Sequence, residues 1–169
     1  VEIDRSLLRI MQADPTLEGM ATTLTVAYTV GLQAFVVHVG DSRVYRYRAE
    51  ALEQMTRDHT LAQSLADAGE IQPGEIRRHA KRHVLTNVIA GRPGEVKPDV
   101  ATFPLQPGDQ MLLCTDGLHD LVSEGDLAAA LGAGKPAEQT CDLLIGKALE
   151  AGGRDNITAV LVRYSAPTN

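Results

Sequence analysis

The sequence predicts an α+β fold built from layers of antiparallel sheet and helix. Three observations lead to this class. Strand-like segments follow one another over residues 21–56, helical patterns then replace them, and strands and helices both return in the last third of the chain. Strands and helices therefore do not alternate one by one, as they do in a doubly wound parallel sheet. The chain has 169 residues, 44% hydrophobic and 22% charged, which suits a single domain over residues 1–169.

The first third of the chain predicts one helix followed by a β-meander. Apolar residues recur at helical spacing from Ile3 to Met11, and Asp14-Pro15 ends that helix. The tripeptide Gly40-Asp41-Ser42 is expected to join two strands as a tight turn. Because short turns connect antiparallel neighbours, we expect successive strands to pair. The strands are predicted at 21–30, 34–39, 44–48 and 51–56.

The rest of the chain predicts short helices, a loop, and further strands and helices. Glycine and proline break residues 59–83 into two short helices, and residues 84–94 are typical of a loop. Ser123 with Asp126 gives a weak capping pattern at a helix start. The strands are predicted at 99–103, 110–114 and 157–164, the last of them buried. The longer helices are predicted at 123–131 and 136–150.

Composition and charge exclude several classes of function. The net charge of −6 argues against a protein that binds nucleic acid by covering its phosphates, and it suits one that recruits cations. We expect no membrane insertion, because no apolar run approaches the roughly 20 residues that span a bilayer. Cys114 and Cys141 belong to no CxxC pair, and we expect them to be reduced rather than joined. Reduced cysteines predict a cytoplasmic protein.

Three acids stand at the ends of predicted strands. Asp41 lies between two strands, Asp116 follows one, and Asp155 precedes the last. Carboxylates held at strand ends are the hard oxygen ligands that Mg²⁺ and Mn²⁺ prefer. Asp120 would lie one helical turn after Asp116, in a like-charge pair that is unfavourable without a cation. Each acid alone also suits a turn or a helix cap, so spacing leaves a metal site and a structural role both open.

Five stretches of the sequence, taken in order, resemble the motifs of one family. They are MATTLTVAY, VHVGDSRVYRYR with LEQMTRDHT, LADAGEIQPGEIRRHAKRHVLTNVIAG, LLCTDGLHD and GRDNITAVLVRY, and together they cover residues 19–164. With these motifs the chain resembles the metal-dependent PP2C-type (PPM) protein serine/threonine phosphatases, particularly the bacterial branch. The resemblance implies a four-layer αββα sandwich, in which two antiparallel β-sheets are flanked by helices. This agrees with the α+β class derived above.

The resemblance also implies a reaction and roles for the acids. Asp116 and Asp155 match acids that hold a catalytic centre of two metal ions. Asp41 matches an acid at a third, weaker metal position, and Asp120 a further acid near it. The implied reaction is hydrolysis of phosphoserine and phosphothreonine by a water that two Mn²⁺ or Mg²⁺ ions activate, without a phosphoenzyme. The implied partners are phosphoprotein substrates of a serine/threonine kinase system.

The sequence departs from the family pattern at its N-terminus. Family members carry an Asp-Gly-x-x-Gly-His-like segment whose acid-Gly pair bridges both central metals. The only aspartates before Gly19 are Asp4 and Asp14, and neither is followed by Gly. We therefore expect an N-terminally incomplete domain, roughly the C-terminal two thirds, that binds Mn²⁺ weakly by itself and exposes a strand edge. A fragment of an active phosphatase, a natural truncation or swapped form, and a non-catalytic module that binds phosphoproteins all stay open.

The remaining charged residues have both functional and structural interpretations. A basic cluster could steer an acidic phosphopeptide or form a solvated helix face; it comprises Arg77, Arg78, Lys81 and Arg82. His38, His59 and His119 could act as acids or bases. His38 suits a satisfied core histidine, whereas His119 stands beside the acids. Arg43 could meet a phosphate or form a structural ion pair. The sequence determines neither the substrate nor the oligomeric state.

Overall fold

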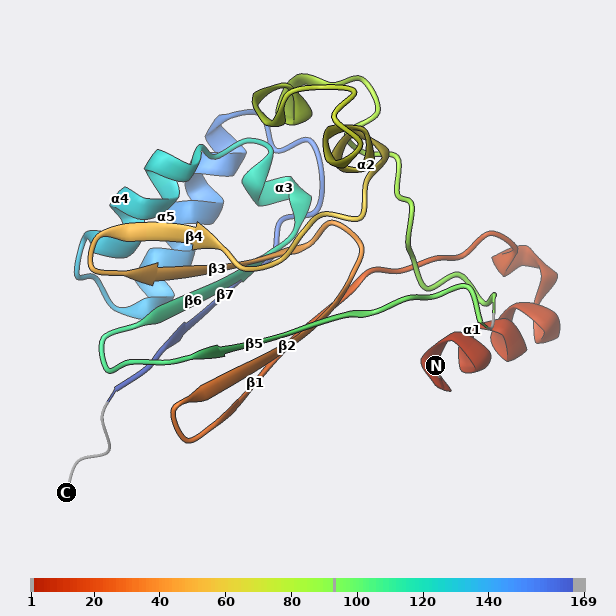
Figure 1. The fold of residues 1–169 in the computed structure, drawn as a ribbon, viewed down its shortest axis with the longest axis horizontal. Helices are drawn as coiled ribbons and strands as arrows, with labels where there is room; N and C mark the ends of the chain where they lie inside the picture. The colour runs from red at the N-terminus through yellow and green to blue at the C-terminus, as the bar shows by residue number, and fades with distance from the viewer. Residues whose placement is uncertain (1, 93, 166–169) are drawn as a thin grey trace. The chain divides into compact units, whose positions relative to one another are not determined.

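The computed structural model, which describes residues 2–92 and 94–165, contains two antiparallel sheets and flanking helices (Figure 1). This confirms the fold class that the sequence predicts. The elements follow in this order: α1 (Glu2–Ala13), η1 (Pro15–Leu17), β1 (Leu24–Val30), β2 (Gln33–Val39), β3 (Arg43–Arg48), β4 (Ala51–Gln54), α2 (Leu61–Asp67), η2 (Pro73–Arg78), β5 (Asp99–Pro104), β6 (Gln110–Cys114), α3 (Asp116–His119), α4 (Glu124–Gly132), α5 (Ala137–Glu150) and β7 (Ala159–Arg163).

The described residues group into two compact units, each made of three stretches of chain. The first unit comprises the described parts of Val1–Ala27, Val36–Asp41 and Arg57–Val100. The second comprises those of Tyr28–Phe35, Ser42–Thr56 and Ala101–Asn169. All four strands of the larger sheet belong to the second unit. A single domain over residues 1–169 stays a prediction.

The strand order corrects the predicted meander at one turn. The smaller sheet has the order β1-β2-β5 and the larger one β4-β3-β6-β7, so β2 and β3 belong to different sheets. Gly40-Asp41-Ser42 therefore leads the chain from one sheet to the other and closes no hairpin. The physical reason is local, because a short turn whose glycine has a φ of 111° fits a corner as well as a hairpin. The turn after β5 likewise connects two sheets.

The larger sheet is fixed by its central strands. Leu112 of β6 lies opposite Tyr45 of β3 on one side and opposite Leu161 of β7 on the other. β7 is an edge strand, and Val160 and Val162 are 49% and 40% exposed. The prediction that this last strand is buried is therefore wrong, because its run of apolar residues looks the same whether the strand has one neighbour or two.

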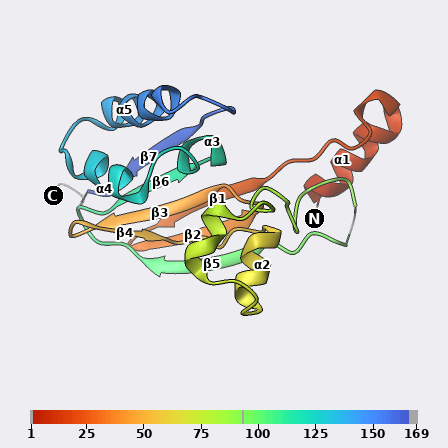
Figure 2. The ribbon, with the colours of Figure 1, turned by 90° about the horizontal axis from the view of Figure 1, so that it is seen from above.

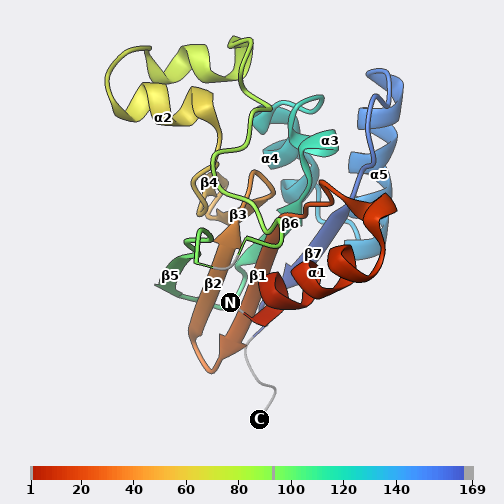
Figure 3. The ribbon, with the colours of Figure 1, turned by 90° about the vertical axis from the view of Figure 1, so that its right-hand side faces the viewer.

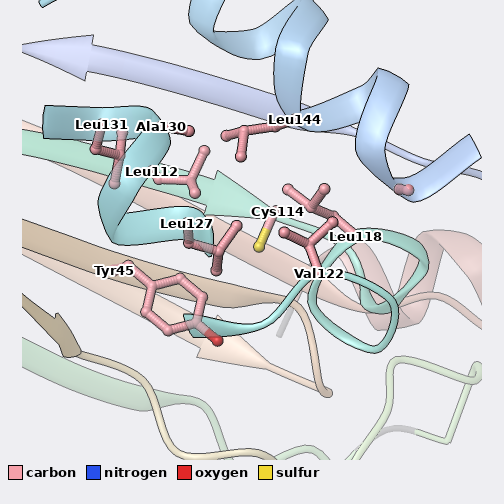
Figure 4. Packing of buried hydrophobic residues seen from close by; sticks show 10 residues of the cluster. Tyr45, Leu112, Cys114, Leu118, Val122, Leu127, Ala130, Leu131 and Leu144 are labelled. Atoms are coloured by element: carbon pink, nitrogen blue, oxygen red, sulfur yellow. The ribbon is translucent and has the colours of Figure 1, made fainter. Parts of the chain in front are cut away.

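Helices cover the larger sheet and close the main core with it. Figure 2 shows α4 and α5 on one face of β6 and β7, where α5 contacts both β7 and α4. Figure 4 shows the side chains that meet there. The buried core consists of Tyr45, Leu112, Cys114, Leu118, Val122, Leu127, Ala130, Leu131, Leu144 and Ala148. Because β6, α3, α4 and α5 all contribute to this core, the C-terminal end of β6 is held by packing on several sides.

The first unit contains α1, η1, α2 and η2. Asp4 of α1 is fully buried, and its Oδ1 accepts hydrogen bonds from the backbone N–H groups of Gly91 (2.9 Å) and Arg92 (3.2 Å). Figure 3 shows α2 followed by the 3-10 helix η2, with which it is in contact. These two elements confirm the two short helices predicted within residues 59–83, although the second is 3-10 rather than α.

Two further findings concern the cysteines and the helices. Cys114 is buried and Cys141 partly exposed, and both are free. Burial raises the pKa of the Cys141 thiol above its ordinary value. In the part of the chain that the structure describes, no helix combines the length and the apolar character that a membrane crossing needs.

A buried ion pair in the second unit gives a stability prediction. Asp109 is 1% exposed and accepts hydrogen bonds from Arg48 Nε (2.7 Å) and Nη2 (2.6 Å). Arg48→Met leaves this carboxylate buried without its cation, so we expect a loss of about 3 kcal/mol in the free energy of unfolding at neutral pH. Urea denaturation measures the loss. The Arg57→Met variant is the control, since it removes only the exposed pair with Asp67 and should cost less than about 1 kcal/mol.

The same pair predicts a pH dependence. The Arg48 guanidinium holds the pKa of Asp109 below its usual range. A folded-state pKa lower than the unfolded one stabilises the fold above the unfolded value, near pH 4, and this contribution is lost as pH falls through the folded value. The difference between wild type and Arg48→Met should therefore shrink below about pH 4. A difference that stays constant from pH 7 to pH 3 would contradict this role of the pair.

Candidate metal centre

Asp116 stands where the central strand β6 leaves the sheet. β6 ends at Cys114, Thr115 is the N-cap residue of α3, and Asp116 is the first residue of that short helix. The backbone N–H of Gly117 donates a hydrogen bond of 2.8 Å to Asp116 Oδ1. An acid in the first turn of a helix is favoured there by the backbone N–H groups. The carboxylate is therefore held in one direction at the end of a buried strand.

Asp155 lies in the loop before β7, at the same end of the sheet. Ala159 of β7 pairs with Cys114 of β6, so the start of β7 adjoins the end of β6. Asp155 is exposed, and its Oδ1 accepts a hydrogen bond of 2.7 Å from the backbone N–H of Asn156. Its local geometry repeats that of Asp116, where the carboxylate also binds the N–H of the next residue.

Thr115 ties the two acidic turns together. Its backbone N–H donates to the carbonyl of Thr158 (3.2 Å), and its Oγ1 accepts from the backbone N–H of Thr158 (3.0 Å). The same hydroxyl donates to the carbonyl of Asn156 (3.3 Å). Three hydrogen bonds thus join residues 41 or more positions apart in the sequence. The turns that carry Asp116 and Asp155 consequently lie side by side.

At Gly117 the turn of Asp116 lies very close to the turn of Asp155. A Cβ added at Gly117 would lie 2.3 Å from the carbonyl oxygen of Asn156 and 3.0 Å from its carbon. Real Cβ atoms do not come that near to backbone atoms, so only glycine fits between the two turns. A glycine directly after Asp116 is therefore required for the contact between the two turns.

Asp120 and His119 extend the site along α3. The backbone N–H of Asp120 donates to the carbonyl of Asp116 (2.9 Å), which places the two acids one helical turn apart, as expected. The Asp120 side chain is 23% exposed. His119, the histidine beside the acids, is buried, and its Nδ1 lies 3.5 Å from Asp120 Oδ1. The His119 side chain therefore lies next to Asp120 and is shielded from solvent.

Asp41 belongs to the first unit, in the corner after β2. It is half-buried and follows Gly40. Over residues 2–92 and 94–165, no group of three or more Asp, Glu, His or Cys side chains comes together as a ready-made metal site. The structure thus brings the turns of Asp116 and Asp155 together, with Asp120 one helical turn away. The roles of all four acids in metal binding stay predictions.

The donor set fits a hard divalent cation. Asp116 and Asp155 present carboxylate oxygens on neighbouring turns whose backbones are fixed by hydrogen bonds. Mg²⁺ and Mn²⁺ prefer oxygen ligands, and Mg²⁺ is commonly bound by one or two carboxylates while it keeps several waters. The close approach that requires Gly117 keeps the space between the turns narrow. These residues fit the group that the sequence motifs imply.

Of the other candidate residues, His38 and Arg43 make structural contacts in the described chain. His38 is 1% exposed, and both of its ring nitrogens are hydrogen-bonded, to Thr25 Oγ1 (2.9 Å) and to the carbonyl of Arg57 (3.1 Å), which confirms it as a satisfied core histidine. Burial lowers its pKa below the ordinary value. Arg43 donates to the hydroxyl of Tyr45 (2.8 Å), whose pKa burial raises. In the basic cluster, Arg77, Arg78 and Lys81 are exposed and Arg82 is half-buried, so both interpretations of it stay open.

Sequence reasoning missed a set of polar residues around Gly40. Sequence patterns indicate His59 only as a possible acid or base, and they single out neither Asn87 nor Asp99. All three are joined by hydrogen bonds in the first unit. The one available signal was the stretch LEQMTRDHT, which contains His59 and follows the Gly-Asp-Ser motif. No sequence spacing links it to Asn87 or Asp99.

Comparison with known proteins identifies relatives over almost the whole chain. Residues 3–165 match the family model described as Stage II sporulation protein E (SpoIIE). The chain is 35% identical over 162 residues to protein phosphatase PhpP of Streptococcus pneumoniae, a match that covers 96% of this chain and 65% of PhpP. The chain thus spans slightly less than two thirds of the length of this relative.

Two solved structures are similar in fold as well. The crystal structure of the Mycobacterium tuberculosis serine/threonine phosphatase PstP/Ppp has a TM-score of 0.90 and 37% identity, and the match covers 96% of this chain and 68% of that one. The catalytic domain of the serine threonine protein phosphatase PstP in complex with two manganese ions has a TM-score of 0.83 and 36% identity, with 94% and 65% covered. Both agree with two antiparallel sheets flanked by helices.

Proposed function

Because the chain belongs to the PP2C-type (PPM) family of protein serine/threonine phosphatases, we propose that the protein hydrolyses phosphoserine and phosphothreonine in other proteins. One observation carries the proposal. The turn of Asp116, after β6, and the turn of Asp155, before β7, are hydrogen-bonded to each other through Thr115. Two carboxylates on rigid neighbouring turns provide the hard ligands that metal-assisted phosphate hydrolysis needs.

We assign Asp116 and Asp155 to the two central Mn²⁺ or Mg²⁺ ions. When bound, the ions supply an activated water for in-line attack on phosphorus and neutralise charge on the phosphoryl oxygens. Each carboxylate uses Oδ1 to accept the N–H of the following residue, which orients the side chain and leaves Oδ2 for a cation. The manganese complex of a PstP catalytic domain supports two ions, and the choice between Mn²⁺ and Mg²⁺ is part of the proposal.

We assign Asp41 to a third, weaker metal position, as its motif implies, and Asp120 separately as a further metal-binding acid. Asp120 lies one helical turn from Asp116, where a second negative charge is unfavourable unless a cation is near. Its neighbour His119 stands 3.5 Å from Asp120 Oδ1 and limits the directions in which the carboxylate can turn. Asp41 follows a strand and occupies a corner that only glycine can form at position 40.

The proposed partners are phosphoprotein substrates of a bacterial serine/threonine kinase system. The named relatives are protein phosphatases, which does not favour the alternative of a module that binds without turnover. The net charge of −6 supports a protein that recruits cations rather than nucleic acid. A cytoplasmic location stays a prediction, supported by the two free cysteines.

The metal requirement tests the proposal directly. We expect the protein, at its full natural length and stripped with a chelator, to release no phosphate from a phosphothreonine peptide. Activity should return with Mn²⁺ or Mg²⁺ but not with Ca²⁺, whose longer and more flexible coordination suits a compact two-ion centre poorly. A phosphotyrosine peptide of the same sequence is the control and should react far more slowly. Full activity in the chelator would refute the metal centre, and no activity with any ion would favour the binding module.

A further inference from the structure

We propose that His59 is a positioning residue that fixes the Gly40–Asp41 corner, and with it the Asp41 carboxylate, for cation binding. The inference rests on the proposed metal role of Asp41 and adds to it the residue that holds Asp41 in place. It is carried by hydrogen bonds within the first unit, which contains both His59 and Asp41. His59 lies 19 positions after Gly40 in the sequence, so this contact is tertiary.

His59 binds both backbone polar groups of Gly40. The N–H of His59 donates to the carbonyl of Gly40 at 2.7 Å, and the N–H of Gly40 donates to His59 Nδ1 at 3.1 Å. One residue therefore satisfies the donor and the acceptor of the peptide units on either side of Gly40. The position of the peptide that leads into Asp41 is set by this pair of bonds.

The imidazole ring is itself held in one orientation. Asn87 Nδ2 donates to His59 Nδ1 (3.0 Å), and His59 Nε2 lies 3.1 Å from Asp99 Oδ2. Because Nδ1 accepts two hydrogen bonds, the proton is on Nε2, which donates to the Asp99 carboxylate. Asn87 is held in turn by Lys97, whose carbonyl accepts from Asn87 Nδ2 (2.7 Å). The ring is 13% exposed, so water competes little for these bonds.

Side-chain packing also restricts the backbone at Gly40. Gly40 has a φ of 111°, and a Cβ there would lie 2.3 Å from Cγ2 of Thr23. The His38 ring stands 4.9 Å from the His59 ring and is fixed by its own two hydrogen bonds. Gly40 is thus confined between Thr23 and the imidazole of His59. The backbone that leads into Asp41 is therefore restricted both by packing and by the hydrogen bonds of His59.

Mn²⁺ binding separates positioning from packing. We expect His59→Leu, which removes the acceptor but keeps an apolar side chain of similar bulk, to weaken the weakest class of Mn²⁺ site about 10-fold, as loss of an orienting neighbour does elsewhere. His59→Asn restores an acceptor near the position of Nδ1 and should change this affinity less than about 3-fold. Paramagnetic resonance titration of Mn²⁺ with the protein at its full natural length reads the affinities without any turnover.

Matched variants identify the cause of any loss. Asp41→Asn should weaken the same class of site, and the double variant with His59→Leu should be no weaker than Asp41→Asn alone. His79→Leu is the control, because His79 Nδ1 also accepts a backbone N–H, from Lys81 (3.2 Å), in a different loop. Asp99→Asn perturbs the ring from an exposed position and should give a smaller loss even if His59→Leu does not fold.

Each outcome supports or overturns one step. Equal affinities in wild type, His59→Leu and Asp99→Asn, with a loss in Asp41→Asn, would overturn positioning by His59. An equal loss in His59→Asn and His59→Leu would overturn the role of the Nδ1 acceptor. No loss in Asp41→Asn would instead refute the metal role of Asp41 in the proposed function, independently of His59.

Discussion

Replacing Asp116 or Asp155 with asparagine should lower kcat/KM for metal-dependent phosphothreonine hydrolysis by at least about 100-fold, since each change removes one negative charge from the ion ligands. Asparagine can still accept the N–H of the next residue through its amide oxygen, as the carboxylates do at 2.8 Å and 2.7 Å. The two turns should therefore keep their shape. Activity is measured with the protein at its full natural length over a range of Mn²⁺ concentrations.

The metal dependence of these variants distinguishes ligation from damage to the fold. If the acids hold the ions, the Mn²⁺ concentration for half-maximal activity should rise in both variants while the thermal midpoint stays near that of wild type. Asp142→Asn, an exposed acid on α5 in the same unit, should behave as wild type. Wild-type activity in either Asp116→Asn or Asp155→Asn would refute the assignment of that residue to the central ions.

Replacing Gly117 with alanine should both destabilise the second unit and weaken metal binding. The new Cβ would lie 2.3 Å from the carbonyl oxygen of Asn156, so the turn of Asp116 and the turn of Asp155 must separate. Overpacking of this kind costs about 1–3 kcal/mol. Because Thr115 joins the same two turns, its hydrogen bonds to Asn156 and Thr158 should weaken as well. Urea denaturation measures the stability, and a Mn²⁺ titration measures the metal affinity.

Gly146→Ala provides the control for this substitution. Gly146 lies in α5, has no atoms within 4 Å of an added Cβ, and should gain up to about 1 kcal/mol from the better helix propensity of alanine. If Gly117→Ala lowers the free energy of unfolding and Gly146→Ala raises it, the destabilisation arises at the contact between the two turns. An unaltered stability and an unaltered Mn²⁺ affinity in Gly117→Ala would show that the two turns can separate freely, against the geometry described here.

Local patterns were sufficient for most of the elements. The strand predicted at 110–114 is β6, with the same limits, and the helices predicted at 123–131 and 136–150 are α4 and α5 within one residue at each end. Ser123 accepts the N–H of Asp126 at 3.1 Å, as its capping pattern indicates. These features depend on neighbours within a few residues, for which sequence periodicity and capping chemistry are direct evidence.

The pairing of strands could not be derived in the same way. A short turn between two strands usually closes a hairpin, so the sequence predicts a hairpin at Gly40. The structure assigns β2 and β3 to different sheets, since β3 pairs with β4 and β6. Likewise, the apolar residues of β7 predicted a buried strand, although β7 has a partner on one side only in the described chain. Both incorrect predictions concern which distant segment of the chain pairs with a given strand.

The sequence by itself determined the class of the fold, most helices and strands, and the acids that the family motifs contain, Asp41, Asp116, Asp120 and Asp155. Spacing, capping and motif order carry this information because they act over short stretches of chain. Only the tertiary structure decided that Thr115 and Gly117 bring two acidic turns together and that His59 holds Gly40. These contacts join residues far apart in the chain, and their energies depend on distances that appear only when the strands have packed.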